Sequence, residues 1–123
     1  MNILPVVPTL KASPEVTALL GTSPLRVWED IAPSGTVYPY AVWSVVTANP
    51  ENHLDCPANI DHVSFQIVVY DTQQKRASDI RAAIRKALEP HCYVTNIHPN
   101  HFERIADTNI FGRGFDANWF LDR

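Results

Sequence analysis

The chain has 123 residues, of which 46% are hydrophobic and 19% are charged, and its formal net charge at pH 7 is −3. Such a chain suits one globular domain with a real core, and its acid excess argues against a general nucleic-acid-binding protein, which needs a basic surface to displace counterions from phosphates. No segment approaches the roughly 18 consecutive apolar residues of a membrane span, so we expect no membrane association.

The first predicted element is a helix over residues 14–20. Ser13 is a suitable N-cap, Pro14 fits the first helical position, and Gly21 can adopt the positive φ that ends a helix. The apolar edge of this helix is formed by Val16, Leu19 and Leu20. Residues 1–12 either extend the helix backwards or form an N-terminal arm, because two prolines in this stretch interrupt a regular helix.

Two strands follow, at residues 25–29 and 39–47, separated by a turn at Pro33-Ser-Gly35. The second strand is apolar on both faces, with Tyr40, Val42 and Val46 on one and Ala41, Trp43 and Val45 on the other. Such a strand is either central in a sheet or meets another subunit with its second face. The long connection 49–59 then joins it to the next strand, and we expect the two strands to pair as an extended hairpin.

The middle of the chain carries the strongest pattern. Residues 62–70 alternate, with Val63, Phe65, Ile67 and Val69 on one side and His62, Ser64, Gln66 and Tyr70 on the other, which predicts a half-buried strand. At Asp71 the period changes, and an amphipathic helix is predicted, with its apolar stripe formed by Ala77, Ile80, Ala83, Ile84, Ala87 and Leu88. Asp71 and Gln74 resemble a capping box, and Pro90 ends the helix.

Short strands are predicted at residues 92–98 and 102–107, a turn or loop at 108–114, and a final strand at 115–122. In the final strand, the inward positions are Phe115, Ala117, Trp119 and Leu121. The resulting order α-β-β-β-α-β-β-β predicts an α+β fold: residues 1–123 form a single domain, in which two main helices pack on one face of a single, mostly antiparallel β-sheet.

One group of residues could bind a metal ion. His91, Cys92, His98 and His101 lie within eleven residues of one another, and zinc requires three or four converging nitrogen, sulfur or oxygen ligands. The chain has neither a Cys-x-x-Cys nor a His-Glu-x-x-His motif. The ordinary interpretation is therefore surface histidines near strand ends and a small buried thiol. No cofactor is expected.

Exposed side chains suggest contacts with other proteins instead. Tyr70 and Phe120 lie on predicted outward faces, and exposed aromatic residues often mark interfaces. The predicted helix has a basic face formed by Lys75, Arg76, Arg81, Arg85 and Lys86, interleaved with Asp79 and Glu89 at i,i+4 spacing. This face is either simply solvated or contacts a neighbouring subunit.

The order and spacing of these elements resemble a known family. The chain opens with a helix ending Ala-Leu-Leu-Gly21, followed by Arg26-Val27 in a strand, the Pro33-Ser-Gly35 turn and the strand entry Tyr38-Pro-Tyr-Ala-Val-Trp43. The strand Val63-Ser-Phe-Gln-Ile-Val-Val-Tyr70 then runs into the helix Ala77–Leu88. Together they resemble the small tail-completion or tail-terminator proteins of long-tailed bacteriophages, most clearly over residues 14–88.

This resemblance implies a structural protein of the virion tail, made in the cytoplasm of the bacterial host, and not an enzyme. Its members close the head-proximal end of the tail tube as a ring, expected to be hexameric, which stops tube polymerisation and provides the joint to the head. The implied partners are copies of itself, the major tail-tube protein and a neck or head-completion protein, while DNA passes through the bore without specific binding.

Candidate contact residues follow from the exposed aromatic, loop and basic positions above. They are Tyr40, Trp43, Glu51, His53, Asp55, Tyr70, Arg81, Arg85 and Phe120. Two other hypotheses stay open: another assembly or adaptor protein of a tube-like secretion system, and a small metal-binding enzyme that uses the His91–His101 group. The lack of a basic and apolar N-terminal signal leads us to expect that Cys56 and Cys92 stay reduced in a cytoplasm.

Overall fold

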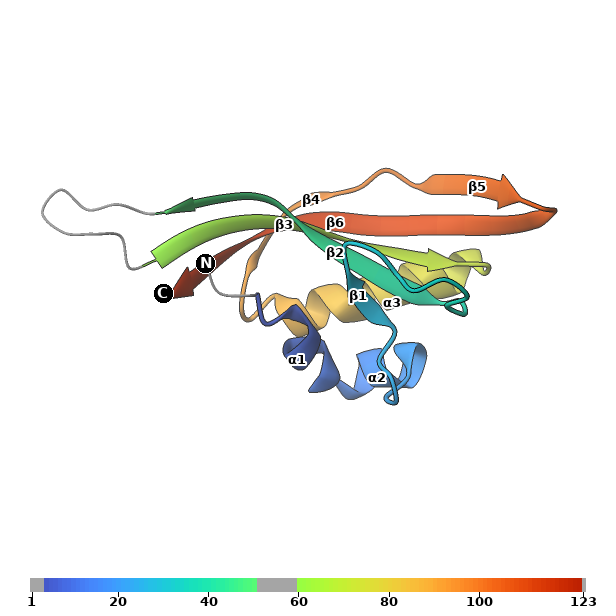
Figure 1. The fold of residues 1–123 in the computed structure, drawn as a ribbon, viewed down its shortest axis with the longest axis horizontal. Coiled ribbons are helices and arrows are strands. Elements are labelled where there is room, and N and C mark those ends of the chain that lie inside the picture. Colours follow the sequence, from blue (N-terminus) through green and yellow to red (C-terminus); the bar gives the residue numbers. More distant parts are fainter. Residues whose placement is uncertain (1–3, 51–59, 123) are drawn as a thin grey trace, which may run out of the picture.

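The computed structural model describes residues 4–50 and 60–122. Over these residues the fold is α+β, with one six-stranded sheet and three helices (Figure 1). The elements in chain order are α1 (Val6–Lys11), α2 (Pro14–Leu20), β1 (Val27–Glu29), β2 (Tyr40–Pro50), β3 (Ile60–Asp71), α3 (Gln74–Leu88), β4 (Tyr93–Ile97), β5 (His101–Ile105) and β6 (Thr108–Asp122). The predicted fold class is confirmed. In the described part of the chain, no helix combines the length and the apolar character that crossing a membrane requires.

The sheet is mostly antiparallel and has β1 at one margin. Its strand order is β1-β2-β3-β6-β4, and β5 pairs with the remaining length of β6. Among the described strands, the three-residue β1 alone runs parallel to its neighbour, β2. β2 and β3 form the predicted hairpin, with Tyr40 opposite Tyr70, and β3 in turn pairs along its whole length with β6. The two longest strands therefore lie side by side in the middle of the sheet.

The helices all lie on one face of the sheet, and the core is between them and the strands (Figure 1). The inward positions of β3 are Val63, Phe65, Ile67 and Val69, each at most 1% exposed. Facing them is the predicted stripe of α3, buried at Ala77, Ile80, Ala83, Ile84 and Leu88. Both periodicities are confirmed, and each large side chain buried here contributes about 1.5–3 kcal/mol.

The described residues that precede β1 form part of this core. The α2 prediction is confirmed: the Ser13 Oγ accepts a hydrogen bond from the Val16 backbone N–H at 3.4 Å, and the helix ends at Gly21 with φ +85°. The residues before it form a separate helix, α1, which buries Val6 and Leu10 completely. A proline is tolerated inside α1 because it lies in the first turn, where no intrahelical N–H bond is lost.

The predicted capping box at the start of α3 is wrong. The N-cap is Gln73, and its side chain makes no capping hydrogen bond. The Asp71 carboxylate is fully buried; it accepts from the backbone N–H groups of Thr72 and Gln73 at 2.7 and 3.4 Å. It also receives two hydrogen bonds from the Arg76 guanidinium, at 2.6 and 2.7 Å. Asp71 ends β3 on the core side of the sheet, so its charge is buried. The guanidinium of Arg76 and the two backbone N–H groups of the turn together compensate this charge.

The predicted loop at residues 108–114 is also wrong, because these residues belong to β6. The turn lies earlier, at Ala106 and Asp107, with φ of +48° and +66°. Position 114 in this strand suits a glycine, because a Cβ there would come within 2.7 Å of the Ile67 carbonyl oxygen. The glycine therefore serves close packing inside the sheet and not a turn.

Candidate interaction surfaces

The face of the sheet opposite the helices is polar and partly exposed. It carries Ser64 and Gln66 of β3 opposite Asn118 and Asp116 of β6, and hydrogen bonds link side chains across the strands. The Ser64 hydroxyl donates to the Asn118 Oδ1 at 2.7 Å, and the His98 Nε2 lies 2.7 Å from the Asp116 Oδ1. We call this surface the open face, since the described helices all cover the other side (Figure 1).

Three tyrosines form a cluster on the open face. The Tyr40 ring lies 5.4 Å from Tyr38 and 5.6 Å from Tyr70, between ring centroids. Burial, followed by the neighbouring Tyr38 and Tyr70, raises the pKa of the Tyr40 hydroxyl. Two of the residues selected from sequence, Tyr40 and Tyr70, are therefore brought into contact because β2 and β3 pair in register.

Phe120 lies on the same face, farther along β6. Its side chain is 47% exposed and stacks on His62 with 4.7 Å between ring centroids. Tyr93 approaches it edge-on at 6.0 Å. The predicted outward position of Phe120 is thus observed, and the tyrosine cluster and Phe120 place aromatic surface toward both ends of the open face.

Trp43 is a core residue and not a surface contact. It is 2% exposed and meets Phe65 edge-on, with 6.5 Å between ring centroids. The second apolar face of β2 is therefore covered by this chain's own helices. The other loop candidates, Glu51, His53 and Asp55, lie outside the described residues.

A cluster of arginines lies where α3 meets β6. Arg113 is 2% exposed, and its guanidinium donates to the Ser78 Oγ at 3.3 Å and to the backbone oxygens of His101 and Gly112 at 3.1 and 2.9 Å. Burial, then Arg113 and Arg85, lowers the pKa of the Arg81 guanidinium. Within the described residues, neither Arg81 nor Arg113 has a carboxylate within 4.0 Å.

The sequence pattern indicated Arg81 and Arg85 but not Arg113. Arg85 pairs with Glu89 at 3.4 Å, as the i,i+4 spacing predicts. Arg113 was overlooked because its segment looked like a loop. The available signal was the alternation in Phe111-Gly-Arg-Gly-Phe115, which gives Arg113 the same inward direction as the buried Phe115.

The margin formed by β4 and β5 exposes apolar side chains. The exposed fractions are 68% for Tyr93, 40% for Ile97, 55% for Phe102 and 52% for Ile105. Both strands pair with β6 on one side only among the described strands. An apolar strand at the margin of a sheet is a ready site for another chain, and the sequence pattern did not predict this site.

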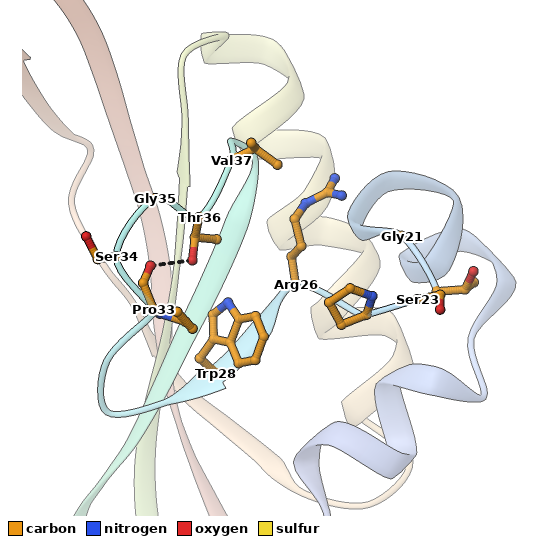
Figure 2. A pocket seen from close by; sticks show the side chains of 11 residues that line it. Gly21, Ser23, Arg26, Trp28, Pro33, Ser34, Gly35, Thr36 and Val37 are labelled. Atoms are coloured by element: carbon orange, nitrogen blue, oxygen red, sulfur yellow. Dashed lines mark hydrogen bonds between the residues drawn. The ribbon is translucent and has the colours of Figure 1, made fainter.

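Figure 2 shows a pocket of about 620 Å³ between the turn after α2 and the loop at residues 33–37. The Trp28 indole lies between Arg26 and Pro33. The guanidinium of Arg26 donates to the backbone oxygens of Pro39 and Leu19, at 2.7 and 3.4 Å. The lining of this pocket contains no carboxylate, imidazole, thiol or amine, so the pocket offers no group for acid–base catalysis near neutral pH.

The four metal candidates are not brought together. His91 stacks on Trp119 with 6.0 Å between ring centroids, and His98 contacts Asp116. The Cys92 thiol donates to the Leu88 carbonyl at 3.3 Å, and burial followed by Glu89 raises its pKa to about 11. His101 is exposed beside Gly112. Across residues 4–50 and 60–122, no three His, Cys, Asp or Glu side chains are grouped as a metal ion needs.

Comparison with known proteins identifies the family. Residues 5–111 match the family described as tail completion protein gp17. The chain belongs to this family. The resemblance recognised in the sequence is thereby confirmed, and the tail completion family is one of structural tail proteins, not enzymes.

The fold has also been seen in a solved structure. A chain described as "Virion of native gene transfer agent (GTA) particle" is 18% identical, with a TM-score of 0.53 over 94% of this chain and 92% of that one. At this identity the likeness concerns the fold alone. No curated protein matched this tail completion protein.

Proposed function

We propose that this tail completion protein closes the head-proximal end of the tail tube as a hexameric ring. In that position it stops the addition of tube subunits and offers a surface to a neck or head-completion protein. The observation that carries the proposal is the family match over residues 5–111. A similar fold in a gene transfer agent virion supports it.

The open face is the proposed contact with the major tail-tube protein or the neck. Tyr40 and Tyr70 lie together on it, and Phe120 is half exposed farther along. Aromatic side chains of this kind supply contact area at a low entropic cost, and their polar neighbours can hydrogen-bond across an interface. The helix-covered face cannot serve in this way because its side chains are already buried in the core.

The proposed bore must let DNA pass without binding it. A chain with a net charge of −3 provides no excess of cations to neutralise phosphates. The cations on α3 are also partly engaged, since Lys75 pairs with Asp79 and Lys86 pairs with Glu15. The charge distribution thus suits a passage that DNA traverses freely.

The direct test is to mix the purified protein with tail tubes that lack it. We expect electron microscopy to show a ring at one end of each tube, and we expect such tubes not to elongate when tube protein is added. A Tyr70→Ala, Phe120→Ala double variant should cap far fewer tubes, whereas Lys75→Ala, on the solvated face of α3, should cap as many as the unaltered chain. Tubes that bear no added density and elongate at the unaltered rate would contradict the proposal.

Light scattering after size exclusion complements this test. A molar mass near that of a hexamer in solution would support the ring directly. A monomer that forms the ring only on tubes would show that the tube templates assembly. A monomer that also fails to bind tubes would exclude the proposed role.

A further inference from the structure

We infer that opposite margins of the sheet meet between neighbouring copies, so that the β1 margin of one subunit contacts the β4–β5 margin of the next. The inference rests on the proposed ring and names its contact surfaces. The acidic margin consists of Glu29, Asp30 and Ile31, at the end of β1. The basic margin consists of Arg81 on α3 with Ile97, Phe102 and Ile105 on β4 and β5.

The acidic margin carries unpaired negative charge. Glu29 and Asp30 are both exposed. Among the described residues, neither carboxylate takes part in an ion pair or a side-chain hydrogen bond. Ile31 follows them and is 79% exposed, the largest exposed fraction among the large apolar side chains described. β1 pairs with β2 on one side and with no described strand on the other. The margin therefore combines two free carboxylates with an exposed apolar side chain.

The basic margin carries the complementary features. Arg81 is partly exposed and lies over the β4–β5 connection, where its guanidinium approaches the His98 carbonyl oxygen at 3.5 Å. Arg113, beneath it, also lacks a carboxylate among the described residues and contacts the His101 carbonyl oxygen. Two adjacent cations that share no anion repel each other, so a carboxylate from outside would relieve the repulsion. Ile97, Phe102 and Ile105 supply the apolar part of this margin.

The two margins carry opposite charges, and they are two different surfaces of the same subunit. A carboxylate against a guanidinium forms a charge-assisted hydrogen bond, and complementary charges fix the register of an interface. Contact of either margin with its own copy would place like charges together. The favoured contact is therefore heterologous, and a heterologous contact forms a ring when the rotation between successive copies closes.

A second copy explains the charge pattern better than an unrelated partner. The strand order places β1 at one margin and β4 at the other, with β5 beside it on β6, so the complement of each surface lies across the same sheet (Figure 1). Each subunit can then use both surfaces at once, one for each neighbour. A chain with only one of these margins could not make this contact with its own copy.

The test is a charge reversal with rescue, made in the full chain and assayed on tail tubes. The single variant Arg81→Glu should reduce the number of capped tubes by tenfold or more. The double variant Glu29→Lys, Asp30→Lys should do the same. The three substitutions combined restore opposite charges across the contact and should return capping to within threefold of the unaltered chain. Lys75→Glu changes the charge of α3 by the same amount at a side chain that is 89% exposed, and it should leave capping unchanged.

The outcomes separate this inference from the proposed function. If the unaltered chain caps tubes but both reversals cap equally well, the margins do not meet, and only the inference fails. A combined variant that caps no better than either reversal, while circular dichroism shows all of them folded, also overturns it. An unaltered chain that caps no tubes refutes the proposed function itself, and the inference with it.

Discussion

The two faces of the sheet are built from the same strands and yet differ in almost every physical respect. On β3, Phe65 and Ile67 are at most 1% exposed against the helices, while Ser64 and Gln66, their immediate neighbours in sequence, line the partly exposed open face. Alternation along a strand thus places stability on one face and leaves the other to recognition. Substitutions on the helix side should reduce the free energy of unfolding, whereas substitutions on the open side should act mainly on assembly.

The largest expected effect is at the centre of the core. Phe65→Ala should lower the free energy of unfolding by about 3–5 kcal/mol, because it leaves a cavity where Trp43 and Trp119 now pack. Urea denaturation followed by tryptophan fluorescence measures it. The matched control is Gln66→Ala, one residue away on the open face, which should cost less than about 1 kcal/mol. Equal costs for the two would remove the distinction between the faces.

Asp71 is the exception on the helix side, a buried carboxylate at the end of an otherwise apolar alternation. Asp71→Asn should cost about 2 kcal/mol, because the charge-assisted bonds to Arg76 and to two backbone N–H groups are weakened. The cost stays below that of breaking a fully buried pair, since the Arg76 side chain is 33% exposed and becomes hydrated. Thermal unfolding of Asp71→Asn beside Asp79→Asn, an exposed partner of Lys75, tests this; similar values would show that burial of Asp71 contributes nothing.

Gly114 tests how tightly the open face is packed. Gly114→Ala should cost about 1–2 kcal/mol, because the new methyl group would meet the Ile67 carbonyl oxygen, the Val68 side chain and the His98 ring. Gly35→Ala has open space around the added carbon, although its φ of +83° is strained for alanine. A loss confined to Gly35→Ala would show that backbone strain, and not crowding in the sheet, dominates. Denaturant midpoints of the two variants make the comparison.

The smallest effect on stability is expected at the outward aromatic residues. Phe120→Ala should cost about 1 kcal/mol or less, because the ring is already 47% exposed and loses mainly its stacking on His62. The same variant should nevertheless reduce capping of tail tubes. A Phe120→Ala chain that unfolds far more easily, yet caps tubes normally, would reverse the assignment of the two faces.

The elements with one clear period were predictable from the sequence. The alternation of β3 and the stripe of α3 fix both elements and the side of each that is buried. The apolar β2 could not be resolved in this way. Both of its faces carry large apolar residues, and only the packing of the helices decides that Trp43 is covered while Tyr40 stays on the open face.

The errors at Gly112 and Gly114 have a physical origin. Glycine is the usual residue of a turn and also the residue that allows close approach inside a sheet, and one sequence does not distinguish the two uses. Here the turn is formed by Ala106 and Asp107, neither of which is a glycine. The same misassignment concealed the buried Arg113, and with it half of the arginine cluster. The charge complement of that cluster, at Glu29 and Asp30, becomes visible only once the strand order is known.

The pairing of β3 with β6 has a mechanical consequence. The two strands are in register from Ile60 and Asp122 at one end to Asp71 and Phe111 at the other. Their hydrogen bonds are perpendicular to the strands, so a pull along β6 loads the whole ladder in shear, and many bonds must fail together. A pull across the margin at β4 or β5 would instead open short ladders one pair at a time. A joint built on this domain would thus resist tension best when its load runs along the two central strands.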